Sequence, residues 1–100
     1  MADDEGADAS GEGGRETVRC WLVDRQSRHE NLVTLVYATP DGTRHLTEQL
    51  SFQLLRRREV TAAREVPAGK LEETPGEETR ERYATQARAM AERHDPDEPV

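Results

Sequence analysis

The residues that could bind a metal ion or act as nucleophiles are one cysteine and three histidines: Cys20, His29, His45 and His94. Their positions do not fit a spacing such as C-x-x-C or H-x-x-x-H, so the sequence predicts no metal site. Cys20 alternates with Val18 and Leu22 in a strand-like pattern, which favours a small buried hydrophobic side chain over a reactive thiolate. A single cysteine also excludes an intramolecular disulfide framework.

Catalytic motifs that can be recognised by spacing are absent from the sequence. It contains no Gly-rich phosphate loop, no dinucleotide-binding fingerprint and no nucleophile elbow. Acid–base catalysis needs carboxylates in a partly buried environment, whereas most acids here lie in the terminal segments and on predicted helix surfaces. Glu48 is the exception, because it interrupts an otherwise apolar strand face. We therefore expect a protein that is not an enzyme, needs no cofactor and has no identified small-molecule substrate.

Arginine offers a different chemistry, because its guanidinium group pairs with phosphates and stacks on bases. Thirteen of the 14 basic residues are arginine. The arginines of the apolar middle of the chain predict a basic patch, for which Trp21 could supply a stacking surface. The candidate contacts for a nucleic acid or another partner are Arg56, Arg57, Arg58, Arg64, Arg44 and Trp21, with Arg19 and Arg25 as further members of the patch. The alternative is that these arginines balance strand glutamates such as Glu48 and Glu65.

Composition and charge set the domain organisation. The 100 residues are 33% hydrophobic and 35% charged, with a mean hydropathy of -0.97 and a net charge of -7. The sequence predicts a disordered acidic tail over 1–14, a single small domain over 15–94 and a disordered acidic end over 95–100. There is no apolar run long enough for a transmembrane helix, and the acidic N-terminal segment does not resemble a secretory signal. We therefore expect a cytoplasmic protein that does not enter a membrane.

The apolar periodicity predicts an α+β fold with a small antiparallel sheet of three to four strands. Strands are expected over 17–25, 31–39 and 44–50, with a polar connection over 24–31 and a hairpin turn at Thr39–Thr43. Residues 59–66 predict an edge strand. Ser51 is expected to cap a short helix over 52–57.

A second helix is expected over 75–94, capped by Thr74 with Glu77 in a capping box. Its narrow apolar stripe predicts a surface that docks on the sheet or on a partner, formed by Tyr83, Ala87 and Met90.

A resemblance to a known group of proteins rests on the middle of the chain. Its motifs are Arg19-Cys20-Trp21-Leu22-Val23-Asp24-Arg25, residues 32–42 and Arg44-His45-Leu46-Thr47. This pattern resembles small uncharacterised proteins of halophilic archaea and covers residues 17–94. The high acid content with a single lysine agrees with it, because carboxylates keep a protein hydrated in concentrated salt. The resemblance implies a soluble cytoplasmic protein that works in molar salt, and it supplies no catalytic or binding residues.

The sequence thus leaves two main functions open, and an enzyme that uses Cys20 or His45 ranks third. The favoured one is a non-catalytic interaction module or accessory subunit, which binds a protein partner or a second copy of itself through the edge strand or the last helix. The alternative is an RNA- or DNA-binding regulator that uses the Arg56–Arg58 patch, although concentrated salt weakens phosphate contacts.

Overall fold

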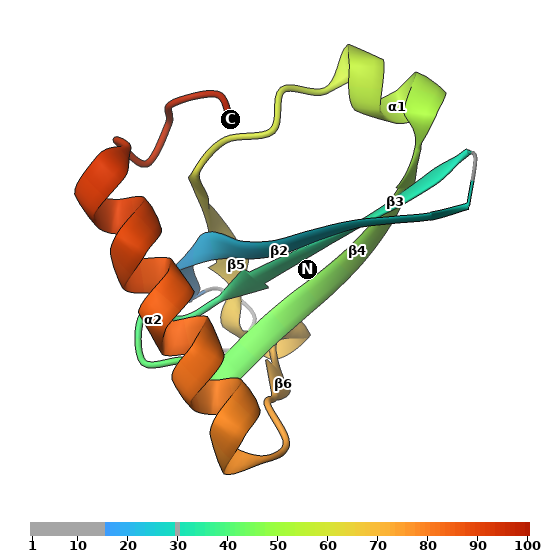
Figure 1. Cartoon of the computed structure of the whole chain (residues 1–100). Coiled ribbons are helices and arrows are strands. Elements are labelled where there is room, and N and C mark those ends of the chain that lie inside the picture. Colours follow the sequence, from blue (N-terminus) through green and yellow to red (C-terminus); the bar gives the residue numbers. More distant parts are fainter. Residues whose placement is uncertain (1–15, 30) are drawn as a thin grey trace, which may run out of the picture.

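A computed structural model describes residues 16–29 and 31–100 of the chain (Figure 1). The tail predicted to be disordered, residues 1–14, lies outside the described residues. The described part contains a five-stranded sheet with two α-helices, and the labels below are those of Figure 1. The elements are β2 (Thr17–His29), β3 (Leu32–Ala38), β4 (Arg44–Ser51), α1 (Phe52–Arg57), β5 (Ala63–Pro67), β6 (Glu72–Glu73) and α2 (Glu77–Arg93).

The sheet has the order β5-β2-β3-β4-β6, and every neighbouring pair is antiparallel. The predicted α+β class with an antiparallel sheet is therefore confirmed, but the sheet has five strands where the sequence predicts three to four. The extra strand, β6, is two glutamates that pair with Arg44 and His45 of β4. It has no apolar alternation, so its pairing depends on the backbone and leaves no signal in the sequence.

Strand β2 extends beyond its predicted end and replaces the expected polar connection. It pairs with β3 as far as His29, and its register shifts between Leu22 and Asp24 and again between Ser27 and His29. Because the first shift adds one residue to β2, the side chains from Asp24 to Ser27 change face relative to simple alternation. Arg25 therefore lies opposite Leu35, and Ser27 lies opposite Val33.

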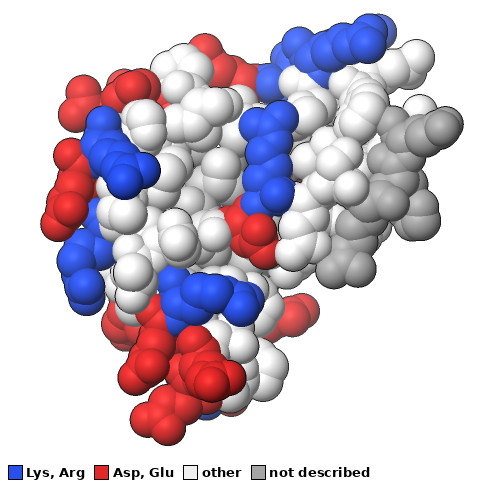
Figure 2. All heavy atoms as spheres, viewed as in Figure 1, with Lys and Arg blue, Asp and Glu red and all other residues white. Residues whose placement is uncertain are grey.

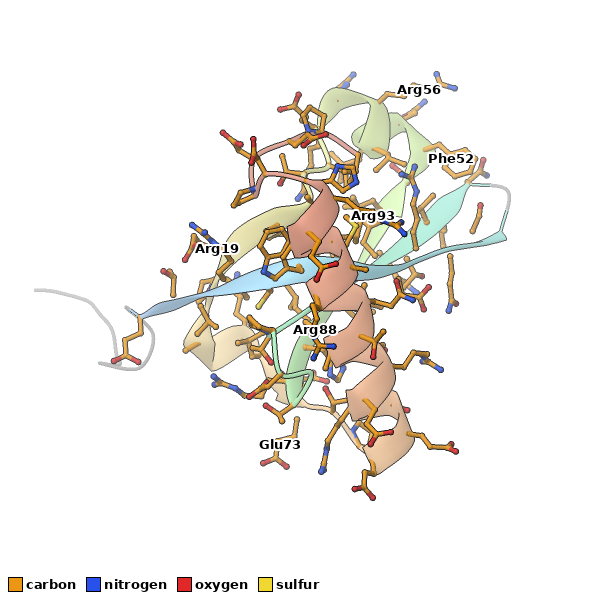
Figure 3. The ribbon with its side chains drawn as sticks, turned by 60° about the vertical axis from the view of Figure 1, so that its left-hand side comes forward. Arg19, Phe52, Arg56, Glu73, Arg88 and Arg93 are labelled. Carbon is orange, nitrogen blue, oxygen red and sulfur yellow. The ribbon has the colours of Figure 1, made fainter. Side chains whose placement is uncertain are left out.

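One face of the sheet is covered by α2, which crosses β2 (Figures 1 and 3). Trp21 is 8% exposed and packs in one cluster with Ala62, Ala63 and Ala87, where Ala87 is the buried residue of α2. The alanines keep the helix close to the sheet, so the large indole fills most of the space between them.

The opposite face carries the larger apolar cluster. Its buried members come from four strands: Cys20, Leu22, Val33, Leu35, Tyr37, Leu50 and Val66. Side chains of α1 and of the segments on either side of β5 pack against it, namely Phe52, Leu55, Val60 and Leu71. The predicted helix over 52–57 is confirmed, and Ser51 Oγ accepts a hydrogen bond from the Leu54 amide at 3.1 Å, as expected for its cap.

Thr74 does not cap α2, which differs from the prediction. The helix begins at Glu77 behind Gly76, with no side-chain cap. Thr74 is completely buried, its hydroxyl lies 3.0 Å from His45 Nδ1 and its carbonyl accepts a hydrogen bond from Arg80 Nε at 2.7 Å. His45 lies 29 residues away in the sequence, so the local capping pattern could not indicate this partner.

The segment 95–100 is paired with the chain, whereas the sequence predicts a disordered end. The Ala63 amide donates to the Pro96 carbonyl, the Ala62 amide to the Glu98 carbonyl and the Val100 amide to the Val60 carbonyl, at 2.8–2.9 Å. The reason is that residues 60–63 offer unpaired backbone groups, which do not depend on the polarity of the segment that pairs with them. Part of the predicted edge strand is therefore covered.

The turn before β4 fixes the distance between the sheet and α2. Gly42 has a φ of 76° and is buried against α2, and a Cβ built on it would overlap the Arg80 carbonyl oxygen and approach the Ala84 amide. Asp41 stabilises the same turn: the Thr43 amide and the hydroxyls of Thr39 and Thr43 donate to it and lower the pKa of its carboxyl to about 2.

Gly42→Ala is expected to lower the free energy of unfolding by about 2–4 kcal/mol. The substitution forces alanine into the left-handed backbone region, and its Cβ overlaps with the backbone of α2. Gly69→Ala is the matched control, because nothing lies within 4 Å of a Cβ at that position. The control is expected to stay within about 1 kcal/mol of the wild type. Urea unfolding followed by circular dichroism measures both, and equal stabilities of the two variants would contradict this packing.

Candidate functional site

Four of the side chains nominated from the sequence are used inside the molecule. Trp21 is buried beneath α2, so its ring is not available to stack on a base. The stripe on α2 faces the chain's own sheet: Ala87 packs in the cluster of Trp21, Met90 packs against both apolar clusters, and Tyr83 meets the His45 ring edge-on at 6.0 Å. This stripe is the surface that attaches α2 to the sheet.

The nominated arginines are distributed over different elements. Arg44 begins β4 opposite Glu73, Arg64 belongs to β5, and Arg58 follows the last turn of α1, which contains Arg56 and Arg57. On the face shown in Figure 2, basic and acidic side chains alternate, with no broad area of one sign. The arginines thus do not form the single continuous patch that the sequence suggests.

Two of these arginines share one carboxylate on the second face of the sheet. Arg64 Nη1 lies 2.8 Å from Glu48 Oε1, and both terminal nitrogens of Arg58 lie 3.3–3.4 Å from the carboxylate oxygens of Glu48. Arg64 also lies 5.3 Å from the centre of the buried Tyr37 ring, whose pKa is raised mainly by burial. This cluster joins β4, β5 and the end of α1, and it gives both arginines a carboxylate partner while keeping one net positive charge.

A hollow lies beside this cluster, between α1 and the far end of the β2–β3 hairpin. It has a volume of about 460 Å³ and is lined by Arg25, Ser27, Val33, Phe52, Leu55 and Arg56. We call it the α1 hollow. Figure 3 labels two of its residues, Phe52 and Arg56, at the α1 end of the molecule.

The lining of the α1 hollow combines apolar and cationic groups. Val33 is 3% exposed, and Phe52 and Leu55 are partly buried, whereas Arg25 and Arg56 are exposed. In the described part of the chain no carboxylate lies within 4.0 Å of either arginine. The hollow can therefore receive an apolar group that carries a negative charge.

Sequence reasoning identified part of this lining. The spacing of Phe52 and Leu55 predicts that they share one helix face, and the basic triplet includes Arg56. Ser27 was missed because it fell in the predicted polar connection. Arg25 was assigned to the patch, but only the register shift in β2 explains why it faces α1.

The described residues contain neither a cluster of metal ligands nor an exposed cysteine nucleophile. No group of three or more His, Cys, Asp or Glu side chains within 16–29 and 31–100 is arranged to hold a metal ion. Cys20 is completely buried, its thiol lies 3.6 Å from the Val18 carbonyl, and burial raises its pKa to about 11.

Across the same described range, no helix has the length and apolar content needed to cross a membrane.

Residues 14–100 match the model of a protein family described as "Family of unknown function (DUF7967)". The chain belongs to this family. No curated protein and no solved structure matches it. The coarser part of the sequence-based resemblance, to a family without an assigned activity, is thereby confirmed. The match covers every element of the fold described above, from β2 to α2 and the paired C-terminal segment.

In this DUF7967 protein, Glu48→Gln is expected to lower the free energy of unfolding by about 1–2 kcal/mol, because the partly buried Arg64 and the more exposed Arg58 both lose their carboxylate. Glu65→Gln is the matched control, since the Arg19–Glu65 pair is about half exposed, and it is expected to cost about 0.5 kcal/mol or less. Chemical denaturation of the two variants measures the difference. Equal losses would mean that the Glu48 cluster is no more than a surface ion pair.

Cys20 is expected to react slowly with a thiol reagent while the protein is folded. A pKa near 11, against 9.0 for the ordinary thiol, reduces the thiolate fraction at about pH 8 roughly a hundredfold, and burial blocks access as well. Stopped-flow modification in buffer and in denaturant compares the two states. Similar rate constants would show that the thiol is accessible in the folded protein.

Proposed function

We propose that this protein is a non-catalytic interaction module or accessory subunit, and that it contacts a protein partner through the α1 end of the molecule. The observation that carries the proposal is the combination of exposed apolar and cationic side chains there. Leu54 is 43% exposed and Arg56 and Arg57 are exposed, while other residues of the same helix, Phe52, Leu55 and Arg56, line the α1 hollow. The stripe on α2, by contrast, is already packed on the sheet.

The size of α1 supports this proposal. The helix has six residues, none of which is buried, and helices of this length are not stable on their own in water. It is kept in place by the Ser51 cap, by Phe52 and Leu55 on the apolar cluster, and by the Arg58–Glu48 pair at its end. A partner that covers Leu54 would bury further apolar surface and lose little backbone conformational entropy, because α1 is already ordered.

We further propose that the protein works in a salt-rich cytoplasm. The net charge of -7 and the single lysine support this proposal. Concentrated salt screens charge pairs between exposed groups, while it strengthens the burial of apolar groups. A contact surface with an apolar centre suits such a solvent better than a purely ionic one.

An RNA- or DNA-binding regulator is the second candidate. The exposed Arg56 and Arg57 favour it, because both lie at one end of a helix and could reach a phosphate backbone. Against it, Arg58 and Arg64 are paired with Glu48, and Trp21 is covered by α2.

Site-specific photocrosslinking tests the proposal. A benzophenone amino acid placed at position 54 is expected to form one discrete adduct with a protein in an extract of the source cells prepared at high salt. The same group at position 81, an exposed site on α2, serves as the control and is expected to give no such adduct. Excess unlabelled chain should compete with the adduct. Adducts at neither position, or equal adducts at both, would contradict the proposal, and an adduct removed by nuclease would favour the second candidate.

A further inference from the structure

We propose that the α1 hollow binds a short acidic segment of a partner protein, in which carboxylates flank one or two large apolar side chains. This inference rests on the proposed function and assigns its ligand. It is argued from three properties of the hollow: its apolar floor, the position of its two arginines and the charge around it.

The floor of the hollow is suited to an apolar side chain. Its apolar lining consists of Val33 of β3 and of Phe52 and Leu55 of α1. These three side chains also belong to or pack against the larger apolar cluster, so the floor is continuous with the core and is rigid on that side. The volume of about 460 Å³ lies within the roughly 300–1,000 Å³ typical of ligand pockets.

The two arginines come from different elements on the rim of the hollow. Arg25 extends from β2, opposite Leu35, while Arg56 extends from the last turn of α1. A peptide that lies between these elements can offer one carboxylate to each guanidinium group while its apolar side chain enters the floor. Arginine suits this task because its fixed fork of donors can bind a carboxylate through two hydrogen bonds.

The two arginines of the hollow have no carboxylate partner among the described residues, so they can bind an added anion. Arg19, Arg58 and Arg64 each have a carboxylate partner, whereas no described carboxylate is within 4.0 Å of Arg25 or Arg56. The acidic segment 1–14 of this chain matches only part of the required chemistry, because it has five acids but no large apolar side chain other than Met1. A partner that supplies both groups is the better fit.

The same properties favour a peptide over a nucleic acid. An extended polyanion needs a continuous track of positive charge, but acidic side chains alternate with basic ones on the face in Figure 2. A short peptide needs positive charge only at the rim. It also gains from the apolar floor, which a phosphate backbone does not.

Binding of synthetic peptides to the full-length chain tests this inference. The probe is a fluorescein-labelled hexapeptide with the one-letter sequence DELFDE, and its matched control is DESSDE, which has the same charge without the apolar pair. Fluorescence anisotropy is expected to show at least about tenfold tighter binding of DELFDE, since two apolar side chains are buried. A peptide with the sequence of residues 1–14 is expected to bind as weakly as DESSDE.

Two arginine variants and one matched control locate the site. Arg25→Gln and Arg56→Gln are each expected to weaken DELFDE binding about threefold to tenfold. Arg57→Gln removes the same charge from the same helix outside the hollow, and its effect is expected to stay within about twofold. Circular dichroism of each variant checks that the fold is kept.

Several results would overturn the inference. Equal affinities for DELFDE and DESSDE would mean that charge alone drives binding, and an equal effect of Arg57→Gln would place the peptide outside the hollow. Displacement of DELFDE by a short single-stranded oligonucleotide at lower concentration would assign the surface to a nucleic acid. An adduct at position 54 without DELFDE binding would overturn this inference but leave the interaction module in place. DELFDE binding without any adduct would instead count against the proposed cellular partner.

Discussion

The fold depends on burying the apolar side chains on both faces of a narrow sheet beneath the few remaining segments of a short chain. The central strands β2 and β3 place apolar side chains on both sides, so each face needs a cover. On one side α2 approaches closely, because small side chains line its contact with Trp21 and because Gly42 leaves room for its backbone. On the other side there is no helix of comparable length among the described residues, and the cover is assembled from smaller parts.

That second cover determines what remains available for binding. Phe52 and Leu55 of α1 close one end of the apolar face, and Arg64 lies over Tyr37 while it pairs with Glu48. The pairing uses the carboxylate that interrupts the apolar strand, and two of the nominated arginines share it. The gap between these parts and the β2–β3 hairpin is the α1 hollow, where Arg25 and Arg56 have no acidic partner among the described residues. The arginines that pair with Glu48 and those that line the hollow thus lie at different positions.

The elements that could be predicted are those specified by neighbouring residues. The turn at Thr39–Thr43 has a proline, an aspartate that bonds to the turn and a glycine with positive φ, and it forms as expected. The Ser51 cap and the short helix behind it also agree with the sequence. The predictions that failed concern contacts between residues that are distant in the sequence, which local patterns do not encode. Thr74 bonds to His45 in place of the helix end, β6 pairs only through its backbone, and residues 95–100 pair with 60–63.

The sequence by itself determined the class of the fold, its main strands and helices, and the absence of recognisable catalytic motifs, because these follow from periodicity, local hydrogen bonding and spacing. It also singled out Glu48 and the arginines. Only the tertiary structure decided which arginines are paired and which line the hollow. The physical reason is that one extra residue in β2 after Leu22 reverses the face of the side chains that follow as far as Ser27, so Arg25 faces α1 and not α2. Alternation along a single strand cannot show such a shift, since it arises only when the strand pairs with its neighbour.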